Sequence, residues 1–253
     1  MATMHGRARI AATLTLALCG IWGTAHANEY KVYSPYVVPG ENEVEARAFY
    51  QQDHNNAAVD QTQVDKLSVG RGITPYWASE LYAEFQGSGH HSLHFDAVEW
   101  ENRFQLTPQN KYWLDLGLLT EAEFPVRSQD PNSIRIGPLL QKQFGRVVAT
   151  ANLFWERQYG ADAAPGTDFS YAARVKWLLT PRFEPAVEFY GATGNFSDFA
   201  PLDRQRHEMG PALYGRVALA PGTGLRYSTA VLFGTTPAAA DATFVARVEY
   251  EFF

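Results

Sequence analysis

Residues Thr243 to Phe253 read T-F-V-A-R-V-E-Y-E-F-F, and their side chains alternate in character. Phe244 and Tyr250 belong to the apolar parity, whereas Arg247 and Glu249 belong to the charged one. Successive side chains of a β-strand point to opposite faces, so the two sets separate onto two sides. The stretch predicts a strand with one apolar face and one charged face.

A final strand of this kind, ending in an aromatic residue, resembles the closing strand of bacterial outer-membrane β-barrels. In that family the terminal Phe, here Phe253, is read by the barrel-assembly machinery, so the resemblance implies this machinery as a partner. One departure is visible, because the apolar alternation ends at Phe252 and the usual parity is displaced by one residue. In architecture the whole mature chain resembles the small-porin group of these barrels, but the resemblance identifies no subfamily.

Short turns and longer polar linkers alternate along the chain. Proline ends a strand because it fixes φ and cannot donate to a sheet ladder, and it recurs in the short turns. Membrane barrels have short periplasmic turns and longer extracellular loops. Five turns and six linkers therefore predict an all-β, single-chain transmembrane antiparallel barrel of twelve strands over residues 42–253. The turns are 73–76, 106–108, 144–146, 179–181 and 220–222; the linkers are 52–61, 87–91, 125–132, 158–168, 193–207 and 235–242.

The apolar faces are predicted to meet lipid and the charged faces to line the lumen. A soluble sandwich or barrel also alternates, but its apolar face turns inward. Too many charges share the second face to fill a dry core, since buried unpaired charges are costly. The segment 92–106 breaks the parity between Ala97 and Val98, which predicts a bulge or an exit from the membrane there.

The first residues have the pattern of a secretory signal peptide. Arg7 and Arg9 precede an apolar run that ends near Trp22, and residues 25–27 form a small-x-small cleavage site. We expect residues 1–27 to be the signal peptide and residues 28–41, with Pro35 and Pro39, to be a periplasmic N-terminal segment. These features predict the outer membrane of a Gram-negative bacterium as the location.

Charge and cysteine content limit the partners and the chemistry that the chain could have. Without residues 1–27 the chain has 21 − 2 = 19 basic and 27 acidic residues, a net charge of −8, which argues against nucleic acid as a partner. The single cysteine, Cys19, lies in the predicted signal peptide, so the mature chain has no thiol. We expect no cofactor, and the sequence leaves the oligomeric state open.

The charged faces supply the candidate pore-lining residues, and two interpretations remain open. In one, a water-filled gap lets small polar or ionic solutes pass, with a slight cation preference; in the other, salt bridges close the lumen. Twelve strands lie between the filled and the open barrel sizes. Glycines on strands, such as Gly70 and Gly117, favour the narrow channel. The candidates are Glu80, Glu84, Glu99, Glu101, Arg103, Asp115, Glu121, Glu123, Arg174, Lys176, Arg216, Arg226 and Arg247.

Other functions have weaker sequence support. His90, His91 and His94 are candidate metal ligands, but rim residues of an external loop have the same pattern. Ser92 and His94 would be the Ser/His pair of an outer-membrane lipid-modifying enzyme, yet no residue orients them and no catalytic motif is present, so we expect no enzyme activity. A structural barrel whose loops bind an outside partner is the remaining alternative.

Overall fold

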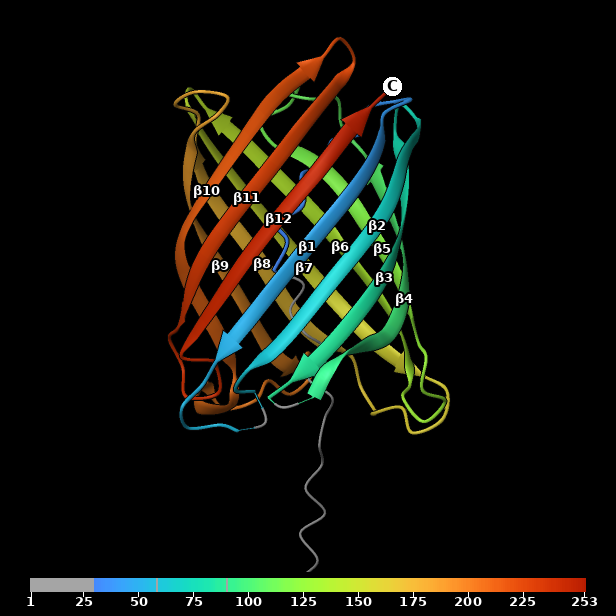
Figure 1. Ribbon diagram of the computed structural model, residues 1–253, viewed down its shortest axis with the longest axis vertical. Coiled ribbons are helices and arrows are strands. Elements are labelled where there is room, and N and C mark those ends of the chain that lie inside the picture. The colour runs from blue at the N-terminus through green and yellow to red at the C-terminus, as the bar shows by residue number, and fades with distance from the viewer. Residues whose placement is uncertain (1–29, 58, 90) are drawn as a thin grey trace, which may run out of the picture.

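A computed structural model describes residues 30–57, 59–89 and 91–253 and shows a closed barrel of twelve antiparallel strands (Figure 1). The predicted signal peptide, residues 1–27, lies outside the described residues. No helix within the described part of the chain is long and apolar enough to cross a membrane. The strands are β1 Asn42–Gln52, β2 Thr62–Thr74, β3 Trp77–Ser88, β4 His91–Gln105, β5 Asp115–Pro125, β6 Asn132–Phe144, β7 Val147–Tyr159, β8 Asp168–Trp177, β9 Glu184–Asn195, β10 Arg206–Ala220, β11 Thr223–Gly234 and β12 Ala242–Phe252.

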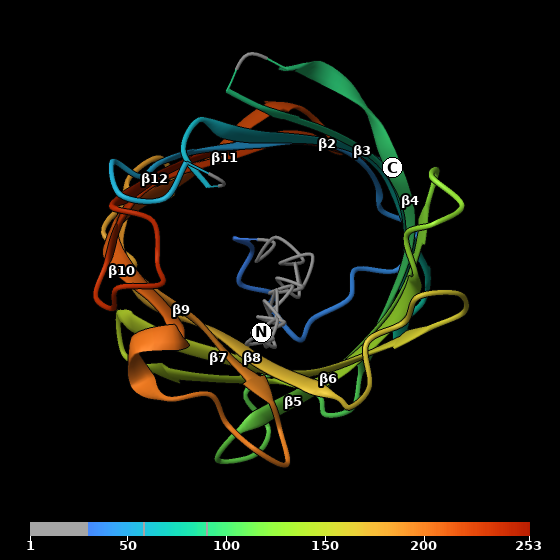
Figure 2. The ribbon, with the colours of Figure 1, turned by 90° about the horizontal axis from the view of Figure 1, so that it is seen from below.

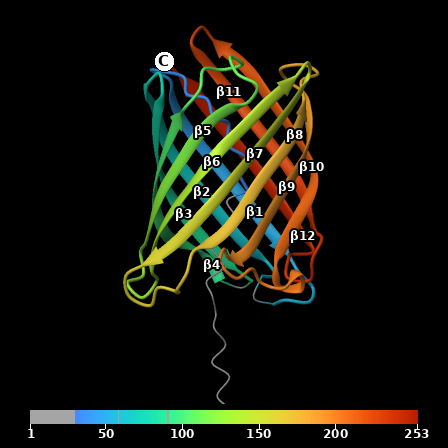
Figure 3. The same ribbon diagram turned by 180° about the vertical axis from the view of Figure 1, so that it is seen from behind.

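The first and last strands close the barrel. β1 pairs with β12 along its whole length, from Asn42 opposite Phe252 to Gln52 opposite Ala242. Every other strand pairs with its neighbours in sequence, so the sheet runs once around without a crossover (Figure 3). Closure removes the sheet edges that an open membrane sheet would leave without hydrogen bonds.

The predicted orientation of the faces is confirmed. In β12, Phe244 and Tyr250 are exposed on the outside, whereas Glu249 and Glu251 are buried inside. The same outward apolar face occurs on other strands, with Leu81 on β3 an example. Lipid is the medium that can cover such a face on a barrel surface.

The connections follow the predicted alternation with three exceptions, one of them the six-residue connection 178–183 between β8 and β9. Two-residue turns lie at 75–76, 145–146 and 221–222 of one end, which we call the short-turn end; the other is the long-loop end. The connection 106–114 at the short-turn end is long, because the Thr107 hydroxyl accepts a hydrogen bond from Leu116 N (2.8 Å) and β5 begins only at Asp115. At the long-loop end, β3 and β4 extend so far that residues 89–90 alone join them.

The predicted irregularity in 92–106 is a bulge. Glu84 and Phe85 of β3 pair with Ala97 and Phe95 of β4, which leaves Asp96 as an extra residue. The extra residue reverses the parity of β4 on either side of it, as a bulge does. The break therefore lies at Asp96 and not between Ala97 and Val98, where the sequence placed it, because Ala97 is buried inside and Val98 is exposed outside.

The segment before β1 differs from the expectation. Residues 30–37, here called the lumen segment, lie inside the ring of strands and not in a periplasmic lead-in (Figure 2). Tyr30, Lys31, Val32, Tyr33 and Val37 are all buried. Their apolar side chains and backbone polar groups require partners, and the inner wall provides both.

Candidate functional site

The candidate pore-lining residues lie on the inner wall of the barrel, and the lumen beside them is occupied by other side chains. Glu80, Glu99, Glu101 and Arg174 are buried there, and Arg216 is exposed near the short-turn end. Glu80 pairs with Glu101 across β3 and β4, so the acidic side of the wall places carboxylates next to each other. That these residues line a solute path stays a prediction.

Lysine and arginine side chains bridge the carboxylates. Lys66 of β2 contacts Glu84 at 2.7 Å and also pairs with Glu99. On the other flank of β1, Arg226 of β11 lies 2.6 Å from Glu251 and 3.3 Å from Glu249 of β12. The ion pairs reduce the repulsion between neighbouring carboxylates and fill the space between the strands. This arrangement matches the interlocking that the closed interpretation expects.

The lumen also contains an apolar cluster that the sequence analysis did not identify. It joins Tyr30, Val32 and Tyr33 of the lumen segment to inward side chains of many strands. The sequence contains a sign of this cluster, because some inward-facing positions of the strands, which are otherwise charged, are apolar. The wall residues are Phe49, Val64, Leu119, Leu139, Phe154, Ala172, Ala186, Tyr190, Ala212, Tyr214, Ala230, Leu232 and Val245.

Asn152 of β7 holds the middle of the lumen segment. Its Oδ1 accepts a hydrogen bond from Tyr33 N at 2.8 Å, and its Nδ2 donates to Tyr33 O at 3.0 Å. One side chain thus satisfies both backbone groups of Tyr33, as a neighbouring strand would. The Tyr33 ring packs edge-on against Phe154, with centroids 6.2 Å apart. Asn152 is itself fully buried, so its amide depends on this contact.

Further hydrogen bonds hold the two ends of the lumen segment. Tyr30 donates its hydroxyl proton to Glu208 Oε1 (2.9 Å). Tyr36 donates to Asp115 Oδ2 (2.6 Å), and Val37 N donates to Gln105 Oε1 (2.9 Å). These contacts come from strands on different sides of the barrel, so the segment crosses the lumen and does not add to one edge.

The glycines expected to leave open space instead accommodate the lumen segment and the wall side chains. A Cβ at Gly117 would lie 2.9 Å from Pro35 Cβ, so only glycine gives the segment this close approach. A Cβ at Gly70 would lie 2.7 Å from the Glu43 carboxylate. The space that the glycines provide is therefore occupied, which removes that argument for an open channel.

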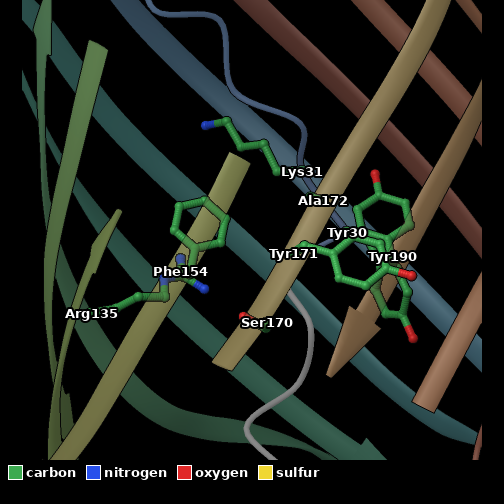
Figure 4. A pocket seen from close by; sticks show the side chains of 8 residues that line it. All are labelled: Tyr30, Lys31, Arg135, Phe154, Ser170, Tyr171, Ala172 and Tyr190. Carbon is green, nitrogen blue, oxygen red and sulfur yellow. The ribbon is translucent and has the colours of Figure 1, made fainter. Parts of the chain in front are cut away.

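A small cavity beside the segment shows how closely the lumen is filled. Tyr30, Lys31, Arg135, Phe154 and Tyr190 are among the residues that line it, with Tyr30 next to Tyr190 (Figure 4). Its volume is about 20 Å³, enough for a single water. The space between these residues therefore admits a water molecule but no larger solute.

The metal and enzyme candidates lie at the long-loop end. His90 is outside the described residues, while His91 and His94 are exposed on β4. His94 Nε2 lies 3.5 Å from Asp96 Oδ1, which Arg127 also contacts at 3.4 Å. Within the described ranges no three His, Cys, Asp or Glu side chains are grouped to hold a metal ion. Ser92 is exposed on the same strand.

A histidine–carboxylate pair links the first and last long loops. His54 Nδ1 and its backbone N lie 2.9 Å and 3.0 Å from Asp241 Oδ2. The hydrogen bond to Asp241 raises the pKa of His54, and the backbone and ring hydrogen bonds from His54 lower the pKa of Asp241. Because the pKa of His54 is raised on folding, the contact contributes its full stability below the unfolded pKa of about 6.5. That stability is lost as pH rises through the folded pKa.

We expect Asp241→Asn to lower the pKa of His54 toward its ordinary value, because the largest cause of the shift is removed. NMR titration of the His54 imidazole measures this directly. Asp60→Asn is the matched control, since Asp60 contributes less to the same shift. An unchanged His54 titration in Asp241→Asn would contradict the loop contact.

Comparisons with known proteins give no family. No family model matches the chain, and no curated protein matches it. Among solved structures, Pseudomonas aeruginosa OprD is 10% identical with a TM-score of 0.41, over 83% of this chain and 66% of that one. The chain thus spans slightly less than two thirds of that structure.

For two further solved structures, the alignment with this chain covers nearly the whole of the solved chain. Acinetobacter baumannii Omp33 is 10% identical with a TM-score of 0.42, over 84% of this chain and 97% of its own. Outer membrane phospholipase A from Escherichia coli is 11% identical with a TM-score of 0.40, over 86% and 98%. Likeness of this degree transfers no activity. The closed barrel and its outward apolar side chains by themselves make the chain a transmembrane β-barrel of the bacterial outer-membrane type.

Proposed function

We propose that the chain lies in the outer membrane of a Gram-negative bacterium and forms a narrow channel for small polar or ionic solutes. The lumen segment closes this channel at rest. The proposal rests on one observation: the barrel has a charged inner wall, and residues 30–37 fill the lumen that this wall encloses. These residues precede β1 and belong to no strand of the barrel. The acidic side of the wall gives the open channel a slight preference for cations.

Withdrawal of the segment is topologically simple. Cleavage after Ala27, which the sequence predicts, would give the chain a free end two residues before Tyr30, and Tyr30 is buried inside the barrel. The segment is connected to the barrel only through residues 38–41, at the short-turn end where β1 begins. A tail with a free end leaves the lumen without threading a loop or breaking a strand pair.

Planar-bilayer recording of two refolded chains tests the proposal. The chain beginning at Asn28 is expected to show rare openings, and the chain beginning at Val38 a sustained current with cation preference. A soluble peptide of residues 28–37 should reduce that current, and Glu121→Gln with Glu123→Gln should weaken the preference. No current from the shortened, folded chain would contradict the proposal.

A closed barrel with a binding role in its loops is the second candidate. Phe196 and Phe199 of the β9–β10 connection are half-exposed and pack with Trp155 and Phe169, with ring centroids 5.4–6.1 Å apart. Such a cluster at the long-loop end suits contact with a partner or with lipid. We assign no enzymatic role, and ester hydrolysis abolished by Ser92→Ala would overturn this.

A further inference from the structure

The ammonium group of Lys31 is held in a cage of carboxylates and aromatic rings. Lys31 Nζ lies 3.2 Å from Glu45 Oε2 and 3.6 Å from Glu80 Oε2. It donates a hydrogen bond to the Tyr82 hydroxyl and lies 4.9 Å and 5.1 Å from the ring centroids of Tyr33 and Tyr82. Carboxylates and aromatic faces together are the groups that recognise an organic ammonium ion.

The two carboxylates of the cage differ in their other partners. Glu45 also contacts Arg247 NH1 at 3.5 Å and Arg47 Nε at 3.6 Å, both from the barrel wall. Glu80 accepts a hydrogen bond from Ser68, and in the described part of the chain Lys31 is its ion-pair partner within 4 Å, whereas Arg103 acts on it from farther away. Withdrawal of the lumen segment therefore removes the cation that lies closest to the buried Glu80 carboxylate.

We propose that Glu80, Glu45 and Tyr82 form a binding site for primary alkylammonium ions, and that Lys31 occupies this site in the closed barrel. The inference rests on the proposed function, because a soluble ammonium ion reaches the cage only when the lumen segment has withdrawn or has lost its own ammonium. The site makes small organic amines the solute class that the open channel prefers. They compete with Lys31 and favour the open state.

Chemical rescue of Lys31→Ala in the full mature chain tests the site. The variant loses the atoms that n-propylammonium contains, so this ion is expected to fill the vacated position. We expect it to raise the midpoint of thermal unfolding by about 5 °C when present at about a hundredfold above its dissociation constant. Neither 1-propanol nor propionate should do so, and the unaltered chain should show a much smaller rise, because its own Lys31 competes for the site. No response of Lys31→Ala to n-propylammonium would overturn the proposal.

A matched pair of second substitutions locates the effect. Lys31→Ala with Glu80→Gln should bind n-propylammonium about tenfold more weakly or worse, because the ion pair with the buried Glu80 carboxylate is lost. Lys31→Ala with Glu84→Gln should retain the response, since Glu84 lies on the same face of β3 but contacts Lys66. Equal effects of the two would show nonspecific attraction to the acidic wall and would overturn the site.

The chain beginning at Val38 provides a measurement that does not depend on folding of the Lys31 variant. Its reversal potential should favour n-propylammonium over sodium, and Glu80→Gln should remove that selectivity. If this chain conducts without such selectivity, the proposal of an ammonium site is wrong, whereas the proposal of a channel is upheld. If it does not conduct but Lys31→Ala is specifically rescued by n-propylammonium, the proposal of a channel is wrong, whereas the proposal of an ammonium site is upheld.

Discussion

Asn152→Leu is expected to raise the open probability of the barrel by about tenfold or more. The substitution removes the partners of both the N–H and the C=O of Tyr33, and each buried group left unsatisfied costs about 1–3 kcal/mol. Since 1.4 kcal/mol corresponds to about tenfold in an equilibrium, the lumen segment shifts toward withdrawal. Single-channel recording measures the open probability, and protease access to the N-terminus from the short-turn side provides an independent measurement.

Thr150→Val is the matched control for Asn152→Leu. Thr150 is buried two residues away on the same inner face of β7, but its hydroxyl donates to Gln141 of the wall at 3.1 Å. It should leave the open probability near that of the unaltered chain. Equal opening by both variants would mean that a damaged wall, and not release of the segment, produces the current.

Glu121→Ala is expected to destabilise the folded barrel by about 3–5 kcal/mol, the usual cost of removing one partner of a buried ion pair. Glu121 of β5 and Arg135 of β6 pair across the inner wall, and both are buried. The Arg135 guanidinium also lies 4.9 Å from the Phe154 ring, which leaves it in a poorly solvated position once the carboxylate is gone. Urea unfolding in lipid vesicles measures the change.

A double substitution separates loss of the pair from loss of volume. Glu121→Leu with Arg135→Met replaces the pair by apolar side chains of similar size, and such replacements are often neutral or stabilising. The double variant should recover most of the stability lost in Glu121→Ala. If it is as unstable as the single variant, the packing of these positions and not their charge determines the effect.

The sequence could predict the barrel because the physical signals are local and repeated. The two-residue period of β12 separates Phe244 and Tyr250 from Glu249 and Glu251, and the structure places these sets outside and inside. A parity break in 92–106 was also readable, since an inserted residue reverses every side chain beyond it, although the sequence placed the break between Ala97 and Val98 and the structure places it at Asp96. Both signals depend only on neighbours in sequence.

The filled lumen could not be predicted in the same way, because it depends on long-range contacts. Tyr33 meets Asn152 across 119 positions of sequence, and nothing in the local pattern joins them. Pro35 and Pro39 predicted a segment without a strand, and residues 30–41 form none, but the prolines do not indicate where the segment lies. Leu119, Leu139 and Val245 were the available hint, since an aqueous lumen has no need of buried apolar residues on its inner face.

The turn lengths show a second limit. Pro108 suggested a tight turn at 106–108, but the Thr107 hydroxyl and Asp115 carboxylate bind backbone N–H groups of Leu116 and Asn110 and hold a longer connection. Side-chain hydrogen bonds to the backbone compete with strand formation, and a pattern of proline positions does not record them.

Disulfide formation in a Pro35→Cys, Gly117→Cys double variant tests the location of the lumen segment most directly. A Cβ at Gly117 would lie 2.9 Å from Pro35 Cβ, and disulfides join Cβ atoms about 3.8 Å apart, so a shift of about 1 Å suffices. Cys19 leaves with the predicted signal peptide, which makes the two new thiols the cysteines of the mature chain.

Both thiols are expected to disappear on mild oxidation of the folded barrel in the membrane. The oxidised barrel should stay closed, and reduction should restore opening. Pro35→Cys with Gly215→Cys is the control, because Gly215 faces outward against the Tyr227 ring and should form no bond with the segment. Two thiols that remain free at positions 35 and 117 of the folded barrel would contradict a channel closed by its own N-terminal residues.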